Sequence, residues 1–269
     1  MLSMKGLLDG LSLHTICESA HCPNIGGCFF RKTATFLILG DVCTRHCTFC
    51  AVKRGVPSPV DKSEPQHLLE AVEKLDLSYV VITSVTRDDL ADGGASQFVR
   101  VINLLHESRN GIAVEVLIPD FLGSTEALKA VVKARPEVIN HNVETIPRLY
   151  HEVRPRADYS RSVELLSAVK RLSPEIVTKS GLMLGLGETK EEVIEVMSDL
   201  REASCDLLTI GQYLQPSPKH HPVVRFVPPD EFSEYEQIGK NMGFADVASA
   251  PLVRSSFKAA ELYSKVRGT

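Results

Sequence analysis

Three closely spaced cysteines are the residues of this chain best suited to carry chemistry. Cys43, Cys47 and Cys50 lie in the segment CTRHCTFC. Thiolates at positions i, i+4 and i+7 can surround one compact metal centre, and such soft ligands favour zinc, copper(I) or iron–sulfur clusters. A structural zinc site usually has four ligands, often as paired C-x2-C groups, so this spacing fits zinc poorly. A four-iron cubane held by only three cysteines keeps one iron open to a ligand that is not protein.

A second trio precedes the first. Cys17, Cys22 and Cys28 have the spacing C-x4-C-x5-C, and a zinc loop with His21 as fourth ligand is an alternative interpretation. Six of the seven cysteines belong to the two trios, and such clustering in a cytosolic chain is more typical of metal binding than of disulfides. We expect the remaining cysteine, Cys205, to pack as a small hydrophobe.

Strand-like and helix-like segments alternate after residue 30. Apolar, β-branched runs predict buried strands, and apolar residues on one face predict helices. Capping boxes are predicted at Ser63 with Gln66 and at Thr189 with Glu192. The predicted strands are Thr33–Leu39, Tyr79–Ser84, Ala113–Ile118, Val138–Val143, Val177–Leu184, Leu207–Tyr213 and a short Ala245–Ala248. Two helices are predicted to begin at Ser63 and at Thr189. Four further helices are predicted to span Ser96–His106, Ser124–Ala134, Ser160–Leu172 and Asp230–Met242.

About six strand–helix units imply an α/β fold with a parallel sheet and right-handed crossovers. Six units are too few for a closed eight-fold barrel, so we expect an open, partial (β/α)6 barrel of the TIM type, with a doubly wound sheet as the alternative. In either fold the active site lies at the carboxyl ends of the strands, where the CTRHCTFC segment falls. We expect a single domain with an N-terminal cluster segment (1–32), the partial barrel (33–248) and a C-terminal segment (249–269).

Composition excludes several function classes. The chain is 43% hydrophobic and 24% charged, with a formal net charge of −4, so no electrostatic signal for nucleic acid is present. No apolar run approaches the roughly 20 residues of a membrane helix, and we expect no membrane partner. The N-terminus lacks the pattern of a signal peptide. We therefore expect a cytoplasmic protein, or an organellar one whose transit peptide has been removed.

The first trio resembles the signature of radical S-adenosylmethionine (SAM) enzymes, C-x3-C-x-aromatic-C, with Phe49 as the aromatic residue. Together with the second trio, the chain resembles the lipoyl synthase family from about Lys5 to the C-terminus. The segments that carry this resemblance include CPNIGGC, VVITSVTRDDLADGGASQF, LIPDF, HNVET, LMLGLGET, TIGQYLQPS and PLVRSSF. Two departures from the family pattern stand out. Phe257 replaces a tyrosine of many members, and the lost hydroxyl affects no expected role. A Lys-Pro-x-Trp-like N-terminal segment of many members is absent, so the resemblance does not establish how the auxiliary cluster is covered or how the carrier docks.

The resemblance implies two [4Fe-4S] clusters and SAM as cofactors. In that family the first trio holds a cluster whose open iron is chelated by SAM. The second trio holds an auxiliary cluster whose sulfides are the sulfur source. Its fourth ligand is a serine of the Arg-Ser-Ser motif, which we assign to Ser256, with Ser255 as the alternative. Radical hydrogen abstraction, fed by two SAM molecules, then places sulfur at C6 and C8 of an octanoyl group.

The partners that the resemblance implies are an octanoylated lipoyl carrier domain (from a 2-oxoacid dehydrogenase E2 or the glycine cleavage H protein), a reductant such as flavodoxin or ferredoxin, and a carrier that rebuilds the auxiliary cluster. Three other functions are alternatives to this one. The first is another radical SAM enzyme, such as a methylthiotransferase or a biotin synthase relative. The second is an electron-transfer protein with complete clusters, and the third is a structural zinc protein.

Residues at strand ends are candidates for binding SAM. The backbone of Phe49 is expected to meet the adenine, Thr83 and Ser84 the amino acid moiety, and Asn142 and Glu144 the ribose or carboxylate groups. Each also has an ordinary interpretation as a strand-end polar group or a helix cap. Weaker candidates are Gly185 and Gly187 for a close SAM approach, and Arg154 and Arg254 for binding sulfide or carboxylate charge. His220 and His221 lack a ligand pattern and read as loop residues.

Overall fold

The computed structural model describes residues 4–30, 34–108 and 111–268. The chain divides into two compact units. The first comprises residues 1–45 and 51–137, and the second comprises His46–Cys50 and Val138–Thr269. The cysteine motif crosses this division, because Cys43 belongs to the first unit while Cys47 and Cys50 belong to the second.

The first unit is built on parallel strands. β2 (Thr35–Ile38), β5 (Tyr79–Ser84) and β6 (Ala113–Leu117) pair in this order. The short β1 (His14–Thr15) adds to β2 in the antiparallel direction. All four residues of β2 are buried, as expected of a strand covered on both faces. A separate two-stranded pair joins β3 (Val42–Cys43) to β4 (Lys53–Arg54) and carries the first cysteine of the motif.

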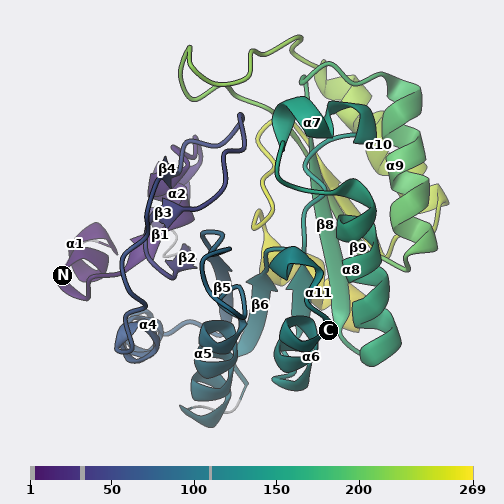
Figure 1. Cartoon of the computed structure of the whole chain (residues 1–269). Helices are drawn as coiled ribbons and strands as arrows, with labels where there is room; N and C mark the ends of the chain where they lie inside the picture. Colours follow the sequence, from purple (N-terminus) through teal and green to yellow (C-terminus); the bar gives the residue numbers. More distant parts are fainter. Residues whose placement is uncertain (1–3, 31–33, 109–110, 269) are drawn as a thin grey trace. The chain divides into compact units, whose positions relative to one another are not determined.

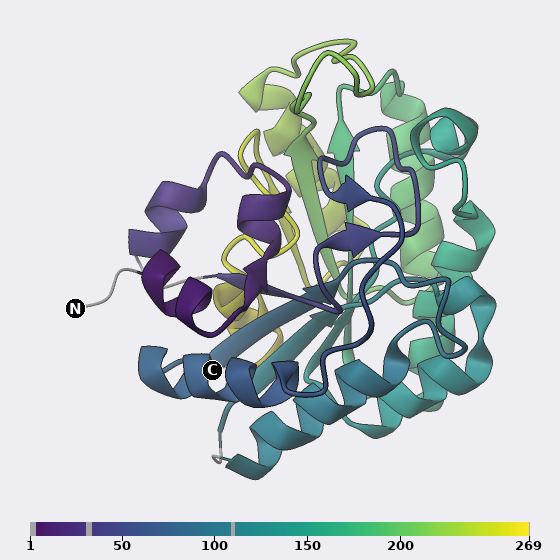
Figure 2. The ribbon, with the colours of Figure 1, turned by 60° about the vertical axis from the view of Figure 1, so that its left-hand side comes forward.

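Helices cover these strands. α4 (Glu64–Leu75), α5 (Ala95–Ser108) and α6 (Thr125–Lys133) lie side by side along β5 and β6, as Figures 1 and 2 both show. α5 turns one apolar face inward, with Phe98, Val101 and Ile102 completely buried. The N-terminal part of the unit forms three short helices, and a 3-10 turn follows β6. These are α1 (Met4–Gly10), α2 (Ile16–Ser19), α3 (Ile25–Phe30) and η1 (Phe121–Gly123).

The second unit repeats the same architecture. β7 (Val138–Asn140), β8 (Val177–Leu184), β9 (Leu207–Gln212) and β10 (Asp246–Ser249) pair in parallel in this order. α8 and α9 lie side by side with α8 against β8 (Figure 1), and Leu262 of the last helix packs on the strand residues Val138, Val177 and Leu207. The helices are η2 (Pro147–Leu149), α7 (Tyr150–Val153), α8 (Tyr159–Leu172), α9 (Lys190–Glu202), α10 (Pro229–Asn241) and α11 (Ala259–Arg267).

The alternation expected from the sequence is confirmed, with local exceptions. The capping box of Thr189 and Glu192 is present. The one at Ser63 is wrong, because the Ser63 hydroxyl donates to Asp61 (2.6 Å) and makes no cap hydrogen bond. The predicted strand start at Thr33 lies outside the described residues. The short helices before residue 31 and the last helix were not predicted, and the division into three segments stays a prediction.

Candidate functional site

The second trio of cysteines sits on short helices of the first unit. Cys17 lies in α2, Cys28 in α3, and Cys22 in the turn between them. The Cys22 amide donates to the Cys17 carbonyl (2.9 Å), and the Cys28 amide donates to the Asn24 carbonyl (2.9 Å). These tight local turns explain how ten intervening positions fold back to bring three thiols into one region. None of the seven cysteines, all of them among the described residues, forms a disulfide.

Electrostatics link the three thiols. Burial raises the pKa of the Cys17 thiol; hydrogen bonds to Thr35 oppose this, and the charges of Cys22 and Cys28 raise it further. The Cys17 thiol therefore lies within electrostatic range of the Cys22 and Cys28 thiols. In the described part of the chain, no three His, Cys, Asp or Glu side chains converge on a point that could hold a single metal ion. A cubane is compatible with this spacing, because each cysteine binds a different iron and the ligands stand farther apart.

Hydrogen bonds fasten Cys43 to the first unit. The Cys43 carbonyl accepts from the Gly55 amide (3.2 Å), and its sulfur accepts from the Arg45 amide (3.4 Å). The next residue, Thr44, donates through both its amide (3.1 Å) and its hydroxyl (3.0 Å) to the Thr86 carbonyl. The start of the motif is thereby fixed to the loop that follows β5.

Arg45 makes the strongest of these attachments. Its guanidinium donates two hydrogen bonds to Asp88 (2.8 and 2.9 Å) and one to Asp120 (2.5 Å). The side chain is only 4% exposed. Burial alone would lower the pKa of Arg45, but the two carboxylates outweigh it and hold the pKa above its ordinary value. Sequence reasoning missed this network. The sequence feature that could have revealed this network is an arginine between the motif cysteines, together with acidic residues that follow two predicted strands.

The other end of the motif is attached to the second unit. Thr48, between Cys47 and Cys50, donates from its amide to the Val153 carbonyl (3.0 Å) and from its hydroxyl to the Glu152 carbonyl (3.0 Å). The Cys50 amide donates to the Cys47 carbonyl (3.3 Å), which closes a turn. Helix α7 therefore holds the segment that carries these two thiols.

Asn142 and Glu144 lie together just beyond β7. The Asn142 amide nitrogen donates to Glu144 (3.1 Å) and to the Ser255 hydroxyl (2.6 Å). The Asn142 carbonyl oxygen Oδ1 is buried and has no hydrogen-bond partner among the described residues. Burial raises the pKa of Glu144 above its usual range, although Arg154 and Asn142 oppose this shift. Glu144 also adopts a left-handed backbone (φ 64°), an uncommon conformation for a residue other than glycine.

Arg154, which is partly buried, brings a cation to the same place. Its Nη1 donates to the carbonyls of Asn142 (3.0 Å) and Val143 (3.2 Å), while its Nε is buried without a partner in the described chain. Burial would lower the pKa of Arg154, but Tyr150, Glu144 and the Cys47 thiolate together raise it. A buried acceptor, a carboxyl and a buried donor thus converge on one area, which suits a ligand with hydroxyl, amino and carboxylate groups.

The turn that carries Arg254, Ser255 and Ser256 packs directly on β9. The Gln212 amide donates to the Pro251 carbonyl (3.2 Å). A Cβ atom placed on Gly211 would lie 2.2 Å from the Val253 carbonyl oxygen, so only glycine allows this close approach. The position of the serine pair in the second unit is therefore set by β9 and by the Asn142–Ser255 hydrogen bond.

Gly211→Ala is expected to destabilise the folded chain by about 1–3 kcal/mol, because the added methyl group forces the turn away from β9. Urea unfolding of the apo protein measures this change. Gly10→Ala is the matched control, since no atom lies within 4 Å of its added Cβ. Equal stability of the two variants would contradict the close packing.

The two strand-end candidates after β5 differ in how their hydroxyls are used. Thr83 Oγ1 donates to the Leu117 carbonyl (3.0 Å) of the neighbouring strand. Ser84 Oγ is buried and finds no partner within the described ranges. Ser84 therefore retains a hydroxyl for a ligand, whereas the hydroxyl of Thr83 is already bonded within the sheet.

Two further sequence candidates have structural explanations. A Cβ on Gly185 would lie 2.3 Å from Gln212 Nε2 and 2.5 Å from the Arg225 carbonyl, so the close approach there is made by the protein's own loop. Cys205 is completely buried and its thiol donates to the Leu207 carbonyl (3.3 Å), while burial raises its pKa to about 12. Its expected role as a small packed hydrophobe is confirmed.

Comparison with known proteins identifies the family. A model of the radical SAM superfamily matches residues 37–200. The chain is 58% identical over 265 residues to the lipoyl synthase of Caldanaerobacter subterraneus subsp. tengcongensis, covering 98% of this chain and 93% of that protein. It is 59% identical over 255 residues to the lipoyl synthase of Caldicellulosiruptor saccharolyticus, covering 95% of this chain and 90% of that protein.

Solved structures agree at the level of the fold. Streptococcus suis SuiB bound to its precursor peptide SuiA matches with a TM-score of 0.63 at 12% identity, over 84% of this chain and 50% of that one. HydG, a maturase of the [FeFe]-hydrogenase, matches with a TM-score of 0.61 at 16% identity, over 86% and 54%. The chain spans about half the length of both. The predicted α/β partial-barrel fold with a mostly parallel sheet is confirmed, and the chain belongs to the lipoyl synthase family of the radical SAM superfamily.

Proposed function

We propose that this chain inserts two sulfur atoms, at C6 and C8, into an octanoyl group carried on a lysine of a lipoyl carrier domain. The observation that carries the proposal is the identity of 58% with a lipoyl synthase over nearly the whole chain. The two cysteine trios, with C-x4-C-x5-C before C-x3-C-x2-C, agree with it. Family membership implies two [4Fe-4S] clusters and SAM as cofactors. Reductive cleavage of SAM supplies the radical chemistry that unactivated C–H bonds require.

Cys43, Cys47 and Cys50 are the proposed ligands of the cluster that binds SAM. Support comes from the attachments of the motif. Arg45 and Thr44 fix its first part, and Thr48 fixes its second part to α7. A ligand segment held in this way needs little reorganisation when it binds a cluster.

Cys17, Cys22 and Cys28 are the proposed ligands of the auxiliary cluster, with Ser256 as the fourth. The electrostatic effect of Cys22 and Cys28 on the Cys17 thiol supports the first part of this assignment. The choice of Ser256 follows from the family's Arg-Ser-Ser motif, and the hydrogen bond from Asn142 to the Ser255 hydroxyl fixes the turn that carries this motif. A serine alkoxide is a hard and weak ligand for iron compared with a thiolate, so it suits a cluster corner that must open.

The proposed SAM contacts are Phe49, Thr83, Ser84, Asn142 and Glu144. The free Oδ1 of Asn142 is an acceptor suited to a ribose hydroxyl, and Glu144 beside it can accept another. Ser84 offers its unused hydroxyl to the amino acid moiety. The buried Nε of Arg154, outside this set, can donate to a carboxylate.

The proposed partners follow from the reaction. They are an octanoylated E2 domain of a 2-oxoacid dehydrogenase or the glycine cleavage H protein, a reductant such as flavodoxin or ferredoxin, and a carrier that rebuilds the auxiliary cluster. We place the reaction in the cytoplasm. No helix of the described residues has the length and apolar character that crossing a membrane would require.

The decisive experiment incubates the anaerobically reconstituted protein with SAM, a reductant and an octanoyl-lysyl peptide. A mass gain of two sulfur atoms on the peptide is the expected result. Failure of the wild-type protein to give this product, while it still cleaves SAM, would favour another radical SAM activity. Failure to cleave SAM at all would favour an electron-transfer protein.

Ser256→Ala and Ser256→Cys are expected to lose sulfur insertion by at least about 10- to 100-fold while SAM cleavage continues, because only the auxiliary cluster is affected. Mass spectrometry of the peptide and quantification of 5′-deoxyadenosine measure the two steps separately. Ser255→Ala is the matched control and is expected to retain insertion within a few-fold of wild type. Loss of insertion in Ser255→Ala alone would reverse the assignment of the ligand.

A further inference from the structure

The loop that joins β9 to α10, residues 213–228, contacts the segment between Cys47 and Cys50. It contains the adjacent His220 and His221, for which the sequence offered no ligand pattern. The loop and the segment His46–Cys50 belong to the same compact unit. The contacts of the two histidines are therefore internal to the second unit.

His220 reaches the backbone of a proposed cluster ligand. Its Nε2 lies 3.2 Å from the Cys50 carbonyl oxygen, and its Nδ1 lies 2.9 Å from the Ser217 hydroxyl. Because a carbonyl oxygen can only accept, Nε2 carries the proton in this contact. The backbone of His220 is also fixed, since its amide donates to the Ser217 carbonyl (3.0 Å) and its carbonyl accepts from Gln215 Nε2 (2.9 Å).

His221 contacts Thr48, which lies two positions before Cys50 in the cluster segment. Its amide donates to the Thr48 carbonyl (2.9 Å). Its ring is 5% exposed, with Nε2 donating to the Leu186 carbonyl (3.0 Å) and Nδ1 lying 3.4 Å from Glu152. The His221 carbonyl accepts from the Tyr213 hydroxyl (2.7 Å). The backbone of the cluster segment is thus tied to this loop at both Thr48 and Cys50.

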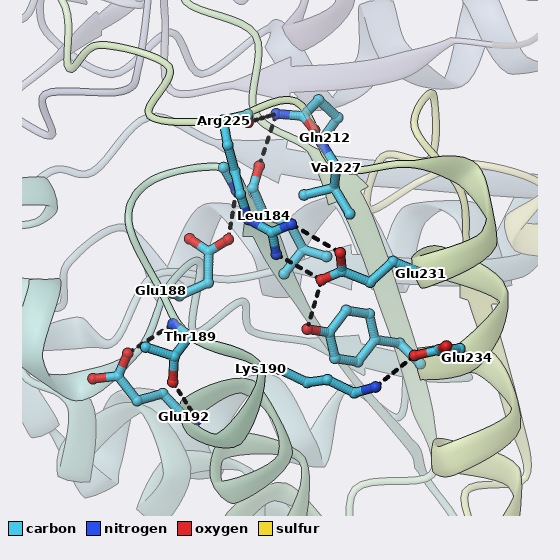
Figure 3. A network of polar contacts seen from close by, with 12 residues as sticks. Leu184, Glu188, Thr189, Lys190, Glu192, Gln212, Arg225, Val227, Glu231 and Glu234 are labelled. Carbon is cyan, nitrogen blue, oxygen red and sulfur yellow. Dashed lines mark hydrogen bonds and ion pairs between the residues drawn. The ribbon is translucent and has the colours of Figure 1, made fainter.

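The base of the loop is itself rigid. The buried Gln212 donates through Nε2 to the carbonyls of Leu184 (3.1 Å) and Arg225 (3.2 Å), and its Oε1 accepts from the Val227 amide (2.9 Å), as Figure 3 shows. Arg225 also pairs with Glu231 of α10 through two hydrogen bonds of 2.8 and 2.6 Å. Both ends of the loop are therefore fixed to each other and to the sheet.

We propose that His220 and His221 are positioning residues for the SAM-binding cluster, which hold the peptide of Cys47–Cys50 in its ligating conformation. The proposal rests on the proposed function, because it requires Cys47 and Cys50 to be cluster ligands. Groups that orient metal ligands commonly change metal affinity by 10–100-fold when they are lost.

The test isolates one cluster. Alanine at Cys17, Cys22 and Cys28 gives a background in which only the proposed SAM-binding cluster can form. In that background His220→Asn and His220→Gln carry the same amide group on side chains that differ by one methylene. Only the glutamine amide reaches the position of Nε2, 3.2 Å from the Cys50 carbonyl.

The expected result is that His220→Asn and His220→Ala lose iron to a chelator about 2- to 10-fold faster than the background protein, because one hydrogen bond of about 0.5–1.4 kcal/mol is lost. Their reduced clusters are also expected to give altered electron paramagnetic resonance spectra. His220→Gln is expected to behave as the background. Lys219→Ala in the same loop and His151→Gln on α7, both exposed residues, are the matched controls.

Equal iron loss from the Asn and Gln variants, or from His220→Ala and Lys219→Ala, would overturn the positioning role. Melting temperatures of the apo proteins show whether each variant folds. If His220→Ala does not fold, the comparison of His220→Asn with His220→Gln decides the outcome. Cys43→Ala in the same background tests the proposed function separately. If four irons remain after that change, the ligand assignment fails whatever His220 does.

Discussion

Replacing any one of Cys43, Cys47 and Cys50 with alanine is expected to remove about four of about eight irons per chain and to abolish SAM cleavage. In the proposed assignment each thiolate holds a different iron of a cubane that already lacks one protein ligand, so the loss of a second corner would leave the cluster without sufficient support. Iron and sulfide analysis after anaerobic reconstitution and the yield of 5′-deoxyadenosine measure the two effects.

Cys205→Ala is the matched control for this prediction. Its thiol is completely buried, its pKa is raised to about 12 by burial, and it donates to a backbone carbonyl, so it offers no thiolate at neutral pH. We expect Cys205→Ala to retain all of its iron and its SAM cleavage. Cys17→Ala is expected to lose the other cluster and still cleave SAM. Iron loss from Cys205→Ala, or none from Cys43→Ala, would contradict the ligand assignment.

Arg45→Met is expected to lower the free energy of unfolding of the apo protein by about 3–5 kcal/mol, because removing one member of a buried ion pair leaves the other charges without compensation. The carboxylates of Asp120 (side chain 1% exposed) and Asp88 (12% exposed) would remain in the interior. Urea unfolding under reducing conditions measures the change. Arg45→Lys is expected to fall between wild type and methionine, since an ammonium group lacks the planar fork that bonds Asp88 twice.

Arg148→Met provides the control for Arg45. Arg148 also forms two hydrogen bonds to one carboxylate, Glu192 (2.7 and 2.9 Å), but its side chain is 55% exposed. Solvent screens such a pair, and we expect little change in stability. A similar small effect for Arg45→Met would show that burial does not set the strength of this network.

The sequence by itself determined the chemistry of the cysteines, because the spacing of both trios is local and the chain between ligands is too short to separate them widely. The alternation of strands and helices could also be predicted from the sequence, since buried parallel strands give short apolar runs and amphipathic helices give a periodic apolar face. Where a local rule failed, a neighbouring group was the cause. Asp61 captured the Ser63 hydroxyl at 2.6 Å, and the predicted capping box did not form.

Only the tertiary structure decided which distant residues meet at the candidate site. Arg45 meets Asp120 across 75 positions, Asn142 meets Ser255 across 113, and His220 meets Cys50 across 170. Such pairs depend on the path of the loops and on the packing of the strands that bear them. Side-chain type and local spacing contain no information about that path, so the sequence predicts the cluster ligands, whereas only the folded chain shows which distant residues contact the segments that bear them.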